Sequence, residues 1–156
     1  MQSMNFIAIL GFAKQIDSRQ ALLAEEAARK ISERGCGVGV GNVSGTFEHA
    51  LNSAKSSKGI TMAIIEQDVC CRDLQNCDIL QIVSSQIDKH KALANQCSGA
   101  LVIGGGHGTL KLIDEFLENQ KRIVAIANSG GIVPKELNAS IEIRDDVDSA
   151  LRSLMC

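Results

Sequence analysis

Tryptophan and tyrosine are absent from this 156-residue chain, which has only four phenylalanines and one proline. The aromatic platforms on which many single-strand binders stack bases are therefore largely missing. The formal net charge is −2 at pH 7, so no overall positive field attracts a polyanion. From these absences we predict that neither nucleic acid nor a membrane is a partner.

Long hydrophobic runs are also missing, and we expect no secretory leader. No apolar stretch approaches the roughly 18 residues of a membrane span. The first residues, MQSMNFIAILGF, have neither a basic start nor a small-residue cleavage site. We therefore expect a cytoplasmic protein, and the length suits one domain over residues 1–156.

The six cysteines lack the spacing of a metal site. Cys70, Cys71 and Cys77 do not form a C-x₂-C pair, and the sequence offers no second pair to face them. We expect reduced, mostly buried thiols and no metal centre.

Apolar runs of strand length alternate with helical patterns along the chain. Almost wholly apolar strands separated by helices are typical of a parallel sheet covered on both faces. The pattern predicts a doubly wound α/β fold with a mainly parallel sheet of about six or seven strands. The expected strands are 5–10, 37–41, 60–65, 78–83, 100–103, 122–127 and 140–143, and the expected helices are 17–33, 44–57, 85–96, 109–119 and 146–154.

Two glycine-rich loops follow expected strands, at residues 104–109 (GGGHGT) and 41–46 (GNVSGT). Ligands of such sheets bind outside the carboxyl ends of the strands. Glycine lets the backbone approach a ligand, and a helix N-terminus favours an anion by roughly 0.3–1 kcal/mol. We predict that the two helix N-termini hold one phosphorylated ligand. The alternative is that both loops are tight turns in which Thr109, Ser44 or Thr46 only caps its helix.

Neither standard nucleotide motif fits the longer glycine run. A Walker A loop needs Gly-Lys-Ser/Thr where this chain has His107-Gly108-Thr109, and no G-x-G-x-x-G follows the strand. A P-loop NTPase and a plain NAD dehydrogenase are therefore disfavoured.

The glycine loop within 38–50, then His90-Lys91, then GGHGT at 105–109 resembles the LONELY GUY group of Rossmann-like proteins. This group is also labelled lysine decarboxylase-like, and it extends to nucleotide-sensing domains and molybdenum-cofactor carriers. The resemblance implies a single Rossmann-like nucleotide-binding domain that forms a homodimer or higher homo-oligomer. Active members are phosphoribohydrolases, which cut the base from a nucleoside 5′-monophosphate.

Two departures from the motif of active members affect the expected chemistry. Their loop reads Gly-Gly-x-Gly-Thr-x-x-Glu, and that Glu falls on Leu112, while the Arg of a basic pair falls on His90. Cleavage of the glycosidic bond develops positive charge on the ribose, which a carboxylate stabilises and leucine cannot. Losing one general acid or base costs roughly 10²–10⁴ in rate. Glu115, nearly one helical turn further on, is the alternative carboxylate, and no catalytic residue is assigned.

Three functions follow. The first is binding of a nucleotide or phosphorylated small molecule in a degenerate phosphoribohydrolase-type site, with a nucleotide monophosphate or similar anion as ligand and no further cofactor. The second is a phosphoribohydrolase with a non-standard carboxylate, and the third is a homo-oligomeric carrier or scaffold without a small ligand. For His90 and Lys91, a solvated helix face is the alternative to a ligand role. The predicted nucleotide- or phosphate-binding residues are Gly41, Asn42, Gly45, Thr46, His90, Lys91, Gly104, Gly105, Gly106, Gly108 and Thr109.

Overall fold

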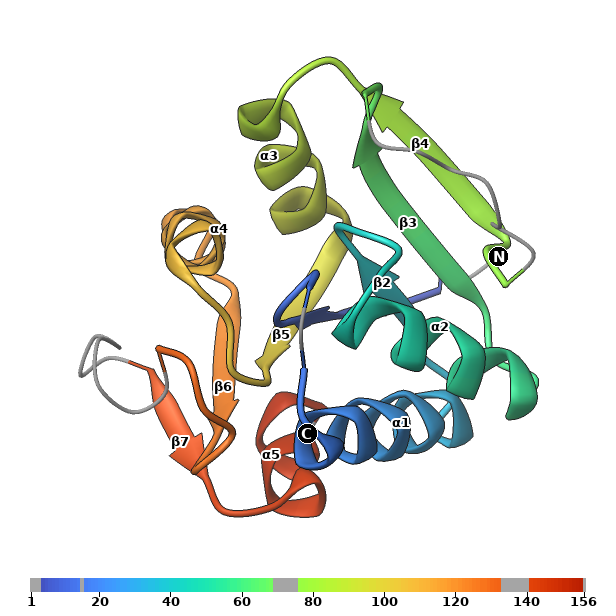
Figure 1. Cartoon of the computed structure of the whole chain (residues 1–156), viewed down its shortest axis with the longest axis vertical. Helices are drawn as coiled ribbons and strands as arrows, with labels where there is room; N and C mark the ends of the chain where they lie inside the picture. Colours follow the sequence, from blue (N-terminus) through green and yellow to red (C-terminus); the bar gives the residue numbers. More distant parts are fainter. Residues whose placement is uncertain (1–3, 15, 69–75, 133–140, 156) are drawn as a thin grey trace.

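A computed structural model describes residues 4–14, 16–68, 76–132 and 141–155, which form seven strands and five helices (Figure 1). The predicted alternation of strands and helices is confirmed, with ends that differ by a few residues. Cys70 and Cys71 lie outside the described residues. In chain order the elements are β1 (Phe6–Leu10), α1 (Ser18–Glu33), β2 (Gly37–Val40), α2 (Thr46–Ser56), β3 (Thr61–Glu66), β4 (Ile79–Val83), α3 (Gln86–Gln96), β5 (Cys97–Val102), α4 (His107–Glu118), β6 (Arg122–Ile126), β7 (Glu142–Arg144) and α5 (Val147–Met155).

The strands form one parallel sheet in the order β4-β3-β2-β1-β5-β6-β7. The chain runs outward from β1 to β4 and then returns to the other side of β1 with β5. Leu10 pairs with Val102, and the amide of Ile103 donates to the carbonyl of Leu10 at 2.8 Å. The loops after β1 and β5 therefore leave the sheet side by side, at the reversal of strand order where doubly wound sheets bind ligands.

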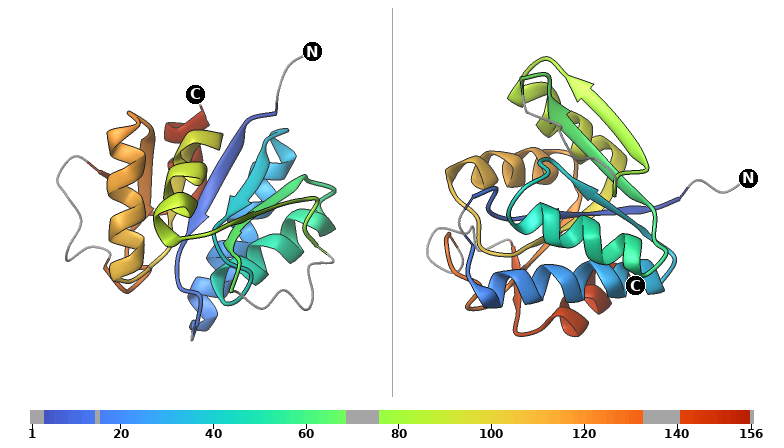
Figure 2. Two further views of the ribbon diagram at one scale, coloured as in Figure 1. Left: turned by 90° about the horizontal axis from the view of Figure 1, so that it is seen from above. Right: turned by 45° about the vertical axis from the view of Figure 1, so that its right-hand side comes forward.

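Helices cover both faces of the sheet, as the sequence predicts (Figure 1). On one face α1, α2 and α5 pack, with α1 beside α2, and on the other α3 lies beside α4 (Figure 2). Strand β1 serves both layers, because Ile7 and Ile9 belong to the first core and Ala8 and Leu10 to the second. Each buried Ile or Leu contributes roughly 1.5–3 kcal/mol, so the two cores hold the strand ends, and the loops beyond them, in place.

Among the helices of the described ranges, none combines the length and the apolar character needed to cross a membrane.

Candidate functional site

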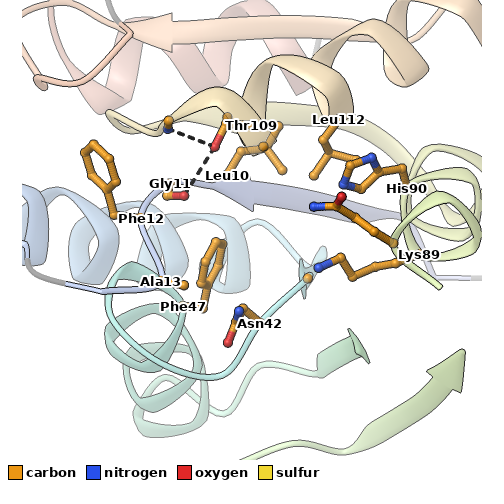
Figure 3. A pocket seen from close by; sticks show the side chains of 14 residues that line it. Leu10, Gly11, Phe12, Ala13, Asn42, Phe47, Lys89, His90, Thr109 and Leu112 are labelled. Atoms are coloured by element: carbon orange, nitrogen blue, oxygen red, sulfur yellow. Dashed lines mark hydrogen bonds between the residues drawn. The ribbon is translucent and has the colours of Figure 1, made fainter. Parts of the chain in front are cut away.

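A cleft of about 220 Å³ opens at the reversal point between β1 and β5 (Figure 3). It is smaller than the roughly 300–1,000 Å³ of most small-molecule sites, so it encloses a compact group and leaves the rest of a larger ligand outside. Its apolar wall is formed by Leu10, Phe12, Ala13, Phe47 and Leu112. Its polar side chains are those of Asn42, Gln86, Lys89, His90 and Thr109, and its glycines are Gly11, Gly41, Gly106 and Gly108.

Gly104 and Gly105 are needed for packing of the loop. Their φ angles are 68° and 99°, in the left-handed region that favours glycine. A Cβ on Gly105 would lie 2.7 Å from Oγ1 of Thr109, and a Cβ on Gly104 would lie 3.0 Å from Nε2 of Gln20. Both glycines are buried, and neither is among the residues that line the cleft.

Two amides of the same loop already have partners within the protein. The amide of Gly104 donates to Oγ of Ser129 at 2.9 Å, and the amide of Gly106 donates to Oγ1 of Thr109 at 3.3 Å. The structure therefore corrects the expectation that the whole glycine run turns free amides toward a ligand. Hydroxyl oxygens accept the amide hydrogens of Gly104 and Gly106. The amides that we assign to anion binding are those of the next two residues, His107 and Gly108.

The start of α4 is the part of the β5–α4 loop region where backbone amides can bind a ligand. The helix begins at His107 with Gly106 as its N-cap, so Thr109 is its third residue and not its N-cap. Gly106 has no capping side chain, and the first turn contains no acidic residue. No acceptor in the described part of the chain takes the amide hydrogens of His107 and Gly108. Free amides and the helix dipole together suit an anion at this edge of the cleft.

At the start of α2, in contrast, the first two backbone amides already have acceptors within the protein. The amide of Thr46 donates to the carbonyl of Phe12 at 2.9 Å, and the amide of Phe47 donates to the carbonyl of Ser44 at 3.2 Å. Oγ1 of Thr46 also accepts from the amide of Phe12, at 3.2 Å. The prediction that two helix N-termini share one ligand is therefore corrected, because the carbonyl of Phe12 in the β1 loop takes the amide of Thr46 and the carbonyl of Ser44 takes that of Phe47.

The predicted residues of the second glycine loop divide into two groups. Gly41 and Asn42 line the cleft, whereas Gly45 and Thr46 do not. Gly45 has a φ of 62°, and a Cβ there would lie within 3.0 Å of the backbone of Phe12 and Ala13. Gly45 is thus required for the contact between this loop and the β1 loop.

One residue of the predicted basic pair lines the cleft. His90 and Lys89 point into it from α3 (Figure 3), while Lys91 is exposed and is not a lining residue. The spacing of Gln86, Lys89 and His90 is i, i+3, i+4, which places the three side chains on one helix face. The family resemblance implies Lys91, whereas the structure places Lys89 at the cleft, a residue that this helical spacing could have identified.

The cleft carries little uncompensated charge. His90 is 8% exposed, and burial lowers the pKa of its imidazole below 6.5, with Lys89 and Lys111 adding to the decrease and Glu66 opposing it. His90 is therefore neutral at pH 7. The ammonium of Lys89 lies 2.7 Å from Oε1 of Glu66, so the cationic group among the described lining residues is already paired.

A carboxylate is missing from the part of the cleft that the structure describes. Leu112 lines the wall from α4 and packs into the second core, with 8% of its surface exposed (Figure 3). Glu115 is half-buried and is not a lining residue. The arrangement gives no described acidic group to a sugar bound in the cleft.

Of the described cysteines, Cys97 is buried and Cys36 and Cys77 are half-buried. Burial raises the pKa of Cys97 to about 12, and desolvation also raises the pKa of Cys36 and of Cys77. Within residues 4–14, 16–68, 76–132 and 141–155, no three His, Cys, Asp or Glu side chains cluster as metal ligands would.

The model of a family described as LDcluster4, the SLOG cluster4 family, matches residues 4–151. No curated protein sequence matches the chain. The structure is similar to that of the molybdenum cofactor binding protein from Rippkaea orientalis, at 19% identity and a TM-score of 0.85, over 98% of this chain and 96% of that one. It is also similar to the molybdenum cofactor carrier protein of Chlamydomonas reinhardtii, at 18% identity and a TM-score of 0.78, over 97% and 96% of the two chains. The Rossmann-like fold and the resemblance to a group that includes such carriers are confirmed.

A third similar structure corrects the prediction about partners. DNA processing protein A from Helicobacter pylori, described by its single-stranded DNA binding mode, shares the fold at 12% identity and a TM-score of 0.75, over 96% of this chain and 80% of that one. The prediction that excluded nucleic acid is wrong, because a protein with this fold binds it. Net charge and aromatic content describe the whole chain, whereas phosphate binding depends on local cations and amides.

Proposed function

The chain belongs to the SLOG cluster4 family, and from that premise we propose that it binds a phosphorylated small molecule, such as a nucleotide, in the cleft between β1 and β5 without hydrolysing it. The start of α4 binds the phosphate, and the apolar wall packs against the remainder of the ligand.

The observation that carries the proposal is the uncapped start of α4. Asp17 caps α1 by accepting from the amide of Gln20, and Ser85 caps α3 by accepting from the amide of Asp88. Gly106 has no side chain to do this for α4, and Gly106 and Gly108 both line the cleft. A phosphate is an anion of the right size and charge for such a position.

The cleft also suits retention of a ligand more than turnover. Phe47 and Leu112 form an apolar wall (Figure 3). Asn42 and Gln86 also line the cleft, with amide groups that can fix a heterocycle by hydrogen bonds. The carboxylate that a phosphoribohydrolase places beside the sugar is replaced by Leu112. This substitution supports binding over the alternative of a hydrolase with a non-standard acid.

A carrier role is the second candidate. Two similar structures are those of a molybdenum cofactor binding protein and a molybdenum cofactor carrier protein. A site that holds a phosphorylated compound without a catalytic acid is compatible with carrying such a cargo. Mass spectrometry of the compound that copurifies with the protein distinguishes a cofactor from a free nucleotide.

Thermal unfolding and calorimetry with AMP, adenosine and inorganic phosphate test the proposal. We expect AMP to raise the Tm and adenosine to have a much smaller effect, because adenosine lacks the phosphate. Lys89→Met should weaken AMP binding by about tenfold or more, the value of one charge-assisted contact. Lys91→Met is the matched control, since Lys91 lies on the same helix outside the cleft. Absence of binding by AMP, phosphate and a wider nucleotide panel would contradict the proposal and favour the scaffold alternative.

A further inference from the structure

Lys89, which lines the cleft, forms an ion pair with Glu66, which does not line it. Nζ of Lys89, on α3, lies 2.7 Å from Oε1 of Glu66, the last residue of β3. The side chain of Lys89 is 11% exposed and that of Glu66 is 25% exposed, so water screens this pair less than a surface pair. Lys89 is a lining residue of the cleft and Glu66 is not.

The stem of Lys89 lies beside the residue that follows β2. A Cβ on Gly41 would lie 3.7 Å from Cδ and 3.8 Å from Cε of Lys89, and 2.9 Å from Cδ1 of Leu93. The lysine stem therefore lies at van der Waals distance from Gly41, and a side chain at Gly41 would crowd Leu93 rather than Lys89. The Lys89 side chain borders the cleft (Figure 3), and its ammonium is also paired with Glu66.

We propose that Glu66 determines which anions the cleft retains, by competing for the ammonium of Lys89. This inference rests on the proposed function, because it concerns the same cleft. The charges of Lys89 and Glu66 cancel, and His90 stays neutral, so the cleft offers no net positive charge from these groups. An anion that reaches Lys89 must replace or tolerate the carboxylate.

Competition by Glu66 for Lys89 has different consequences for inorganic phosphate and for a larger phosphorylated ligand. Free inorganic phosphate has few contacts with which to offset the carboxylate, so its binding falls to a low level. A larger phosphorylated ligand also packs on the apolar wall and bonds to the amides at the start of α4, so it is retained in spite of Glu66. Glu66 thus lowers the affinity for every anion that reaches Lys89, and only ligands with further contacts in the cleft stay bound.

Calorimetric titration of AMP and inorganic phosphate into wild type, Glu66→Gln and Glu26→Gln tests this inference. Glutamine keeps the size of the side chain and removes its charge. We expect Glu66→Gln to bind AMP about tenfold more tightly and to bring inorganic phosphate into the measurable range. Glu26→Gln is the matched control, because Glu26 has a 2.8 Å ion pair with Lys30 on α1, outside the cleft, and should leave both affinities unchanged.

A double variant separates competition from positioning. In a Lys89→Met background, Glu66→Gln should give no gain, because the ammonium that it releases is missing. An unchanged or weaker affinity of Glu66→Gln for AMP would overturn the inference and show that the carboxylate only positions Lys89. If wild type binds AMP, that result leaves the proposed function standing, whereas failure of both wild type and Glu66→Gln to bind AMP or phosphate contradicts the two together. Circular dichroism of each variant confirms that it is folded.

Discussion

The hydroxyl of Ser129 accepts a 2.9 Å hydrogen bond from the amide of Gly104 and donates a 2.7 Å bond to the carbonyl of Ile126. Nε2 of Gln20, at the start of α1, donates to the carbonyl of Ser129 at 2.7 Å. Gln20 and Ser129 are 5% and 2% exposed. This buried chain of contacts joins α1 and the loop after β6 to the loop that carries the start of α4.

Ser129→Ala should therefore destabilise the protein and weaken AMP binding together. The substitution leaves the buried amide of Gly104 without its acceptor, which costs about 1–3 kcal/mol. Urea denaturation measures the stability, and calorimetry the affinity. Ser98→Ala is the control: the exposed Ser98 donates to the carbonyl of Phe6 at 3.3 Å, and its loss should change stability by less than about 0.5 kcal/mol. Equal effects of the two variants would contradict the role given to Ser129.

Gly105→Ala and Gly108→Ala should have opposite effects on stability. At Gly105 the φ of 99° and the nearby Thr109 side chain make alanine destabilising, by about 1 kcal/mol or more. At Gly108 the nearest atom to a Cβ, among those described, is Nε2 of Gln86 at 3.7 Å, so alanine should stabilise α4 by a few tenths of a kcal/mol or more. Gly108→Ala should nevertheless weaken AMP binding, because its methyl group covers an amide at the cleft. A Gly108→Ala protein that binds AMP as tightly as wild type would place the phosphate elsewhere.

Stability should fall as pH decreases from about 7 to 5, and His90 is the reason. Burial lowers the folded-state pKa of His90 below 6.5, so the unfolded chain binds more protons in this range. The stabilisation from neutral His90 is present above pH 6.5, the unfolded-state pKa, and is lost as pH falls from there through the lower folded-state pKa. Asp78 and Asp148, whose pKa values lie below 3.8 because of hydrogen bonds to Lys55 and Lys30, lose their contributions only at lower pH.

Urea denaturation at several pH values between 5 and 7 measures this slope. His90→Gln should flatten it, and His49→Gln, a change on α2 outside the cleft, serves as the matched control. A slope that is the same in wild type and in His90→Gln would rule out the assignment to His90.

AMP incubated with the protein should be recovered intact. The described lining residues include no carboxylate, and loss of a general acid or base lowers the rate by roughly 10²–10⁴. Chromatography for free adenine checks this, with a phosphoribohydrolase of known activity as the positive control. Release of adenine at the rate of that enzyme would contradict a binding function, and loss of the release in Glu115→Gln would then identify the acid.

The fold could be predicted from the sequence because both of its signals are local. Apolar runs such as residues 5–10 and 122–127 are too apolar for a one-sided sheet, and the helical patterns between them supply the covering layers. The β5–α4 loop contributes Gly106, Gly108 and Thr109 to the lining of the cleft, and their binding of a ligand stays a prediction. The carboxyl-end rule needs only the order of strands and loops.

The rest of the site depends on contacts between distant segments. Ser129 and the carbonyl of Phe12 take amides that look free in the sequence, and Gly104 and Gly45 serve packing against those same segments. Glu66 reaches Lys89 only because β3 and α3 meet at the same edge. No periodicity or motif encodes such pairs. The predicted homo-oligomer stays a prediction, which light scattering tests.

The central claim is that free amides at the start of α4 bind the phosphate of a ligand, and amide chemical shifts test it most directly. In a ¹⁵N–¹H spectrum titrated with AMP, we predict large, saturable shifts at His107 and Gly108. The amide of Gly104, which is bonded to Ser129, should shift much less. A saturating titration in which His107 and Gly108 do not move would contradict the account.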